Sequence, residues 1–458
     1  MSRNTSSANL PVAANTSTKA PVVVAVVSYL LVCSSGLIVE SLTATRPSRQ
    51  LVFQQRDSYV SCSSLLRPYR NSELYGASGT DGTPSSNGAK WLDKGILLSS
   101  FTDGLKSNPQ AQDWLFEALV ENLWKEEQYT VQKALELSNM VSPCNGPDPA
   151  MWKQLEDIDQ AVQELYTTEE KVDEQVAATL SSSSWRRSLE LLRNRRKEEK
   201  GQPVELRLLY IPTALYALRK DSTNTPGKQR QRARADGKKR RNEIVQMLTQ
   251  QLGVSVSAVT LDFDDGSVKQ PEYTAISSDD GSKEEPKFPA TGEEAFSDWM
   301  PHLIYVQGGN TFWLHHCMEK GDWGEALVEA CCDKQGGSPS AVYCGVSAGA
   351  ILVGKSMQTA CWKEWDDPSV VPGRKTYEDW TDVKGLGLVG STSFFPHMEN
   401  QWQSMVDRRT KELASTIEQS REDGDKLPLV CCLADEEVCF VEGQRQFTRI
   451  LSPVPHAA

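Results

Sequence analysis

The ten residues AVYCGVSAGA (341–350) carry the pattern that is most informative about the fold. An apolar run typical of a buried strand leads into Gly-x-Ser-x-Gly, and a helix of small residues is expected to follow from Ala348. Such a turn is tight, so the residues that flank Ser347 must be small. The serine would project at a helix N-terminus, where backbone N–H groups favour developing negative charge. We therefore predict that Ser347 is a nucleophile; a glycine-rich turn with an incidental serine is the alternative.

Strand-like and helix-like segments alternate on both sides of this turn. Apolar runs typical of buried strands lie at 95–100, 206–211, 254–263 and 302–306, with two short ones near the C-terminus at 429–433 and 437–441. Apolar residues at helical spacing predict helices over 109–125, 242–252, 311–320 and 323–333. This alternation predicts an α/β fold with a mostly parallel sheet.

Composition narrows the class of protein. The chain has 458 residues, of which 39% are apolar and 24% charged, which excludes collagen, coiled-coil rods, multi-span membrane proteins and wholesale disorder. A net charge of −12 argues against a general nucleic-acid binder. The basic run 228–241 could be an import signal or an RNA-binding patch, but a solvated helix face is favoured. The eleven cysteines include no C-x-x-C pair and predict neither a zinc site nor a disulfide framework.

The N-terminal part differs from the rest of the chain. Residues 20–39 are uncharged and mostly apolar, so residues 1–44 are expected to be a signal sequence or membrane anchor. That would place the protein in the secretory pathway, in an organelle or on a membrane. Residues 45–90 are expected to be a disordered linker and 91–458 the folded domain. Within it, we expect a surface helical insertion at 126–200 and a mobile acidic loop at 264–299.

A second turn follows the strand predicted at 302–306. Gln307-Gly308-Gly309-Asn310 would allow backbone N–H groups to approach a ligand without interference from a Cβ atom. Because the carboxyl ends of parallel strands meet at one crevice, Gly308 or Gly309 could supply one oxyanion donor and Ala348 the other. A tight connection or a phosphate-binding turn is the alternative, although neither G-x-G-x-x-G nor a P-loop lysine is present.

His397 is the favoured base for Ser347. It ends the short apolar segment Phe394-Phe395-Pro396, whereas the other histidines lie in a predicted helix, at the start of a strand or in the C-terminal tail. A structural histidine is the alternative. The acid that would orient it is predicted to be Asp435, with Glu436 second. A rival set of acids follows the nucleophile helix: Glu364, Asp366 and Asp367.

Taken together and in this order, these segments resemble peptidase family S51, which includes dipeptidase E and cyanophycinase. The matching stretches are VQGGNTFWL (306–314), GVSAGA (345–350), GLGLV (385–389), FFPHMEN (394–400) and LADEEVCFVEG (433–443). The resemblance implies a class I glutamine amidotransferase-like α/β fold and a serine-type peptidase with a Ser-His-acid centre. It also implies that Asn310, Arg408 and Arg409 contact substrate, the arginines through an acidic group. No metal or organic cofactor is implied.

These inferences predict hydrolysis of small peptides through an acyl-enzyme. The alternative is a catalytically inactive protein of the same fold whose helical insertion and charged loops form an interaction surface. Related folds use cysteine to release ammonia from glutamine, but Cys344 precedes the turn by three residues, which disfavours that chemistry. No nucleic-acid partner is expected, residues 20–39 could attach the chain to a membrane, and the oligomeric state is left open.

Overall fold

The computed structural model describes most of the chain from Trp91 to Ile450. The described residues are 32–33, 36–37, 91–141, 149–167, 174–200, 203–220, 222–276, 286–332, 339–380, 383–417, 429–443 and 446–450. Strands β1 (Val32–Cys33) and β2 (Gly36–Leu37) pair antiparallel within a separate unit, Met1–Pro84. All other elements belong to the unit Ser85–Ala458.

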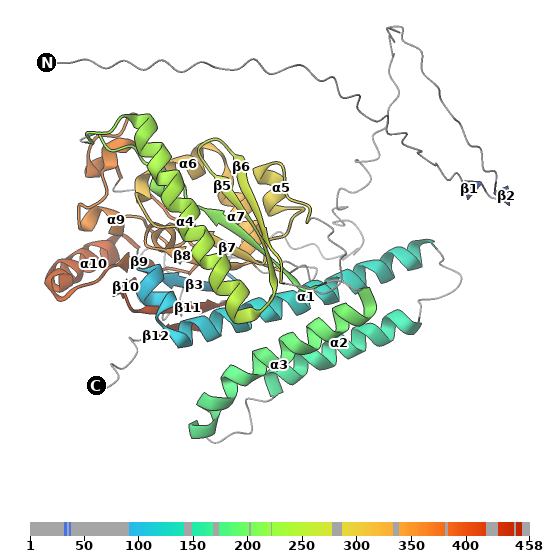
Figure 1. The fold of residues 1–458 in the computed structure, drawn as a ribbon. Coiled ribbons are helices and arrows are strands. Elements are labelled where there is room, and N and C mark those ends of the chain that lie inside the picture. Colours follow the sequence, from blue (N-terminus) through green and yellow to red (C-terminus); the bar gives the residue numbers. More distant parts are fainter. Residues whose placement is uncertain are drawn as a thin grey trace, which may run out of the picture. The chain divides into compact units, whose positions relative to one another are not determined.

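The larger unit is built around an eight-stranded sheet (Figure 1). Its five central strands are parallel, while the strands at both ends are antiparallel to their neighbours. The predicted α/β fold with a mostly parallel sheet flanked by helices is therefore confirmed. In spatial order the strands are β12 (Gln446–Ile450), β11 (Val438–Glu442), β3 (Lys94–Leu98), β8 (Val342–Val346), β7 (Leu303–Val306), β4 (Glu205–Ile211), β5 (Ser255–Asp262) and β6 (Ser267–Thr274).

Helices cover both faces of this sheet. Successive strand residues point to opposite faces, so Leu208 joins the core beneath α1, α3 and α4, whereas Leu209 joins the core beneath α6, α7 and α8. Both leucines are fully buried. The α-helices are α1 (Pro109–Val141), α2 (Pro149–Thr167), α3 (Glu174–Lys200), α4 (Pro226–Leu252), α5 (Gly292–Phe296), α6 (Thr311–Lys320), α7 (Trp323–Cys331), α8 (Ala348–Leu352), α9 (Thr359–Trp362) and α10 (Gln403–Ile417). Short π- or 3-10 turns are η2 (Thr102–Lys106), η3 (Thr213–Tyr216), η4 (Pro368–Val370), η5 (Tyr377–Trp380) and η6 (Asn400–Trp402).

A second, two-stranded sheet lies outside the main one. It consists of β9 (Ser393–Pro396) and β10 (Val430–Leu433), which run parallel. The two strands lie far apart in the sequence, and each is followed directly by residues that were predicted for the site. This small sheet therefore places His397 and the segment containing Asp435 side by side.

The segment 126–200, predicted to be a helical insertion on the surface, is helical where it is described, but its boundary and its burial differ from the prediction. Helix α1 continues without a break from Pro109 to Val141, so no structural boundary lies at 126. Helices α2 and α3 lie alongside it (Figure 1). Part of α3 also enters the core, because Trp185, Leu189 and Leu192 are buried. The high charge content of the segment reflects the outer faces of helices whose inner faces are apolar.

The expected mobile loop at 264–299 is also partly wrong. Ser267–Thr274 forms the edge strand β6, which pairs antiparallel with β5, and Gly292–Phe296 forms α5. An edge strand faces solvent and commonly carries charged residues and proline, so its composition resembles that of a loop. Buried Arg241 on α4 also forms an ion pair with Glu272 on this strand, with Nη2 and Oε2 2.5 Å apart. Residues 277–285, within the predicted loop, lie outside the described residues.

A buried polar cluster ties α1 and α3 to the sheet. Glu126 on α1 contacts His302 at 3.1 Å, Arg207 on β4 at 2.6 Å and Arg196 on α3 at 3.2 Å. Burial alone would raise the pKa of Glu126, but these partners hold it well below its usual range. Burial lowers the pKa of His302 to about 4, so the imidazole is neutral at pH 7 and its Nδ1 accepts a hydrogen bond from the Arg207 backbone N–H.

Replacing Glu126 by glutamine is expected to lower the free energy of unfolding by about 3 kcal/mol, because the partly buried guanidinium groups of Arg207 and Arg196 lose this carboxylate, although Arg196 keeps its contact with Glu127. The measurement is urea-induced unfolding at pH 7, followed by tryptophan fluorescence. Glu156→Gln on the exposed face of α2 is the matched control and should change stability by less than about 0.5 kcal/mol. Equal effects of the two changes would show that the cluster contributes nothing particular.

No helix in the described part of the chain is both long and apolar enough to cross a membrane. The segment 20–39, for which a targeting or anchoring role was predicted, lies outside the described residues apart from β1 and β2. The same holds for the predicted linker at 45–90.

Candidate active site

The Gly-x-Ser-x-Gly turn joins β8 to α8. Ser347 has a positive φ of 50° with ψ of −103°, and its N–H donates to the Leu98 carbonyl oxygen at 2.7 Å. The glycines on either side of Ser347 are required because there is no room for a side chain at either position. A Cβ on Gly345 would lie 2.8 Å from the Gly349 carbonyl oxygen, and one on Gly349 would collide with the carbonyl oxygen of Val306. The backbones at Gly345, Gly349 and Val306 are therefore closely packed, and this packing holds Ser347 at the carboxyl end of β8.

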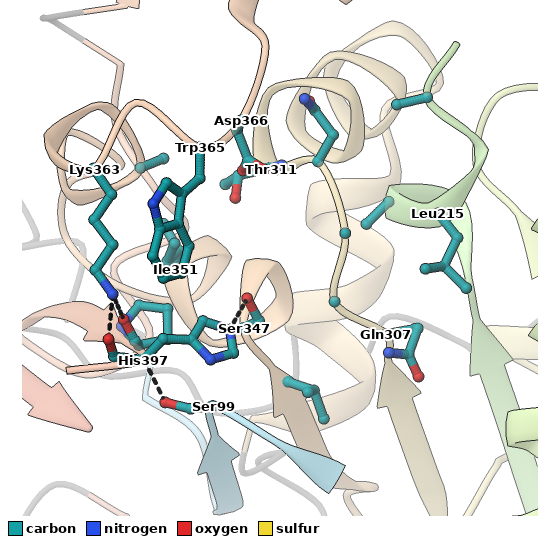
Figure 2. A pocket seen from close by; sticks show the side chains of 18 of the residues that line it. Ser99, Leu215, Gln307, Thr311, Ser347, Ile351, Lys363, Trp365, Asp366 and His397 are labelled. Carbon is teal, nitrogen blue, oxygen red and sulfur yellow. Dashed lines mark hydrogen bonds between the residues drawn. The ribbon is translucent and has the colours of Figure 1, made fainter. Parts of the chain in front are cut away.

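His397 directly follows β9. Its φ is also positive, at 55°, and its backbone N–H donates to Ser99 Oγ at 2.8 Å (Figure 2). The Ser99 hydroxyl in turn donates to the Leu433 carbonyl oxygen at the end of β10, also at 2.8 Å. Buried Ser99, one residue beyond β3, thus links the main sheet to both strands of the small sheet.

Ser347, His397 and Asp435 form a continuous hydrogen-bonded row. His397 Nε2 lies 3.1 Å from Ser347 Oγ, and Nδ1 lies 2.5 Å from Asp435 Oδ1. With a proton on Nδ1 donated to the carboxylate, Nε2 is left to accept the serine proton. The Asp435 side chain is 53% exposed and that of His397 29%, so the acid faces solvent while the imidazole is more enclosed.

These three residues line a cavity of about 840 Å3 at the carboxyl ends of the parallel strands. Gly308, Gly309 and Asn310 line it as well, so the structure brings together the predicted residues of both turns. A Cβ on Gly308 would lie 2.9 Å from Ser347 Cβ, which shows how closely the two turns approach. Ala348 follows Ser347 as the first residue of α8.

Asn310 has a structural task at the cavity wall. Its Oδ1 accepts from the Trp313 N–H at 2.8 Å and so caps α6, while its Nδ2 donates to the Asp367 carbonyl oxygen at 3.0 Å. The rival acid Asp366 accepts from the Thr311 N–H at 2.8 Å, and burial raises its pKa. In the described structure the hydrogen-bonded partner of the His397 imidazole is Asp435, not Asp366.

Arg408 and Arg409 do not reach the cavity. Both lie on the exposed side of α10, where Arg408 Nε is 4.0 Å and Arg409 Nη1 3.0 Å from Glu412. The two side chains are 66% and 49% exposed, respectively. Helical spacing directs them away from the strand ends, so the expectation that they contact substrate is not supported. Arg219 and Arg240 line the cavity instead.

Several cavity residues were not predicted. Lys363 and Trp365 follow α9 and stand beside His397, and Ser99 supports the His397 backbone (Figure 2). Ser99 could have been found, because it follows a predicted parallel strand whose carboxyl end must face the same crevice. Lys363 and Trp365 lie in an irregular segment, and no sequence pattern indicates where such a segment folds back.

Comparison with known proteins was made against family models, curated proteins and solved structures. Residues 299–448 match the model of Peptidase family S51. The resemblance is thereby confirmed over this segment, which contains Ser347, His397 and Asp435, and it supports a peptidase role. No curated protein matches the chain.

Solved structures similar to this S51-matching chain include two bacterial proteins. One is a protein from Listeria monocytogenes EGD-e that is provisionally named peptidase E. It is 16% identical to this chain, with a TM-score of 0.29, and the similarity covers 57% of this chain and 92% of that protein. The other is a peptidase from an acI-B1 Actinobacterium. It is 12% identical to this chain, with a TM-score of 0.33, and the similarity covers 79% of this chain and 88% of that protein. These scores are too low to add to the assignment.

Proposed function

We propose that this protein is a serine-type peptidase that hydrolyses small peptides through an acyl-enzyme. The observation that carries the proposal is the hydrogen-bonded row of Ser347, His397 and Asp435 at the wall of a cavity, within the segment that matches family S51. A volume of about 840 Å3 is in the range of sites that enclose a small ligand, which favours short peptides over folded chains.

In the proposed reaction, His397 Nε2 removes the proton from Ser347 Oγ as the oxygen attacks the peptide carbonyl carbon. The N–H groups of Gly308 or Gly309 and of Ala348 stabilise the oxyanion. Collapse of the intermediate breaks the C–N bond, and the imidazolium gives its proton to the leaving amine. Water, activated by the same imidazole, then hydrolyses the ester and restores Ser347.

Two other readings receive less support. In an ammonia-releasing amidotransferase a cysteine would attack, but Cys344 is fully buried within β8, and burial raises the pKa of its thiol. In an inactive protein of the same fold, no function would require the serine and the imidazole to lie within hydrogen-bonding distance. The contact between Ser347 and His397 therefore favours the enzyme.

The proposal is tested by incubating the full chain with a fluorophosphonate probe and locating the label by mass spectrometry. We expect one modified residue, Ser347. Digestion of a synthetic library of di- to octapeptides then identifies the substrate length. A protein that neither takes the label nor cleaves any peptide would be better described as an inactive protein of this fold.

A separate prediction concerns Asp435 as the acid that orients the His397 imidazole. Replacing Asp435 by asparagine is expected to slow hydrolysis by about 100-fold, since the imidazole loses the partner that fixes its tautomer. This is less than the loss typical of a buried triad acid, because water can reach the half-exposed Asp435 position. Steady-state kinetics on the best library peptide measure it, with Asp366→Asn as the matched comparison. A larger loss in Asp366→Asn would reverse the assignment of the acid.

A further inference from the structure

Lys363 occupies an unusual position behind the imidazole. Its Nζ donates to the backbone carbonyl oxygens of Pro396, at 3.0 Å, and of His397 itself (Figure 2). The side chain thus reaches across from the segment after α9 to the end of β9. We infer that Lys363 is a positioning residue whose ammonium group holds the His397 backbone in place, so that loss of its charge at alkaline pH loosens the Ser347–His397 contact. The inference rests on the proposed function.

The His397 backbone needs such support. A φ of 55° is in the left-handed region, which costs a non-glycine residue on the order of 1 kcal/mol. The Ser99 hydroxyl accepts from the His397 N–H on one side, and Lys363 donates to its carbonyl oxygen on the other. Charge-assisted hydrogen bonds are about twice as strong as neutral ones, so the lysine supplies the stronger of these two restraints.

Aromatic rings enclose the ammonium group. Nζ lies 4.1 Å from the ring centre of Trp365, 4.5 Å from that of Phe395 and 5.4 Å from that of Trp402. Rings at these distances attract a cation and exclude water around it. The Trp365 ring also lies 5.9 Å from the His397 imidazole. The same aromatic group therefore favours the charged lysine and packs against the proposed base.

The charge on Lys363 is nevertheless lost more readily than that of an ordinary lysine. Burial lowers its pKa to about 8, although the nearby Glu399, Asp435 and Cys432 act in the opposite direction. Among the described residues, these three and His397 are the titratable groups that we find to act on or contact Nζ. Below pH 8 the ammonium is present and both carbonyl oxygens have a charged donor. Above pH 8 the neutral amine donates weakly, and the restraint on His397 is reduced.

The test compares Lys363→Met with Lys363→Arg in the full chain. The rate of fluorophosphonate labelling at Ser347 is measured from pH 6 to pH 10, which needs no knowledge of the substrate. At pH 7 Lys363→Met should label about 10- to 100-fold more slowly, the effect of losing hydrogen bonds from a charged donor. The wild-type rate should fall with a midpoint near pH 8 and converge on that of Lys363→Met. Lys363→Arg keeps its charge and should show no such decline.

Lys411→Met, an exposed lysine on α10, is the matched control and should follow the wild type at every pH. Thermal unfolding shows whether each variant is folded. Superimposable profiles of wild type and Lys363→Met would overturn the inference, as would a decline near pH 8 that persists in Lys363→Arg. Either result would leave the proposed peptidase intact.

A second measurement separates the two proposals. The imidazole resonances of His397, assigned by comparison with His397→Gln, are followed by NMR over the same pH range. We expect a transition near pH 8 in the wild type that is absent from both Lys363 variants. If Ser347 takes no label but this transition is present, the proposed function fails while the role of Lys363 stands. If the transition is missing or unchanged in the variants, the role of Lys363 fails.

Discussion

Replacing Ser347 by alanine is expected to reduce peptide hydrolysis by at least about 10⁴-fold and to abolish labelling by fluorophosphonates. The change removes the only atom that forms the ester, but it leaves the backbone of the turn unaltered. Alanine is smaller than serine, so the close approach of Gly308 to the Ser347 Cβ is unaffected. Substrate binding should therefore persist, and isothermal calorimetry with an uncleaved library peptide can measure it.

Ser404→Ala is the control for this change, because Ser404 is exposed at the start of α10 and outside the cavity. It should retain full activity and full labelling. Residual hydrolysis by Ser347→Ala within tenfold of the wild-type rate would mean that another group attacks the substrate. The acyl-enzyme mechanism would then have to be abandoned.

Replacing His397 by glutamine is expected to lower the rate by at least about 10³-fold, because Ser347 loses the acceptor for its proton. Glutamine is of similar size and polarity, yet it cannot accept and return a proton near neutral pH. Combining this change with Ser347→Ala should produce no further loss, since residues that act as a unit have non-additive effects. Single-turnover kinetics of the two single variants and the double variant measure this.

His316→Gln is the matched control, because His316 lies on α6 and outside the cavity. It should be as active as the wild type. If instead His397→Gln and His316→Gln lost activity equally, the effect would come from destabilisation rather than from lost base catalysis. A double variant slower than either single variant would show that Ser347 and His397 act in separate steps.

The sequence was sufficient to predict most strands of the sheet and most of the candidate site. Parallel strands end at one edge, so Ser347 after β8 and Gly308 after β7 could be placed together from their positions alone. His397 and Asp435 follow the same logic, although their strands form a separate small sheet. In each case the prediction depended on short-range patterns, namely apolar runs and the turns that end them.

The remainder depends on contacts that local patterns do not encode. Arg408 and Arg409 follow the base closely in sequence, but the rotation of α10 turns them outward. Lys363 lies 34 residues before His397 and reaches it through an irregular segment. β6 was missed since a solvent-facing edge strand has the composition of a loop. The face that a helix turns toward the cavity and the path by which a loop folds back are both set by tertiary packing.

The separation of the site between two sheets has a mechanical consequence. The proposed nucleophile is fixed to the eight-stranded sheet, whereas the base and acid follow the two strands of the smaller one. A shift of the small sheet by one ångström would carry imidazole and carboxylate together, lengthening the gap to the hydroxyl and stretching the two hydrogen bonds of Ser99. Misplacement of this size can cost about 10²-fold in rate. The two hydrogen bonds of Ser99 therefore keep the smaller sheet in register with the larger one, and with it the distance across which the proton must pass.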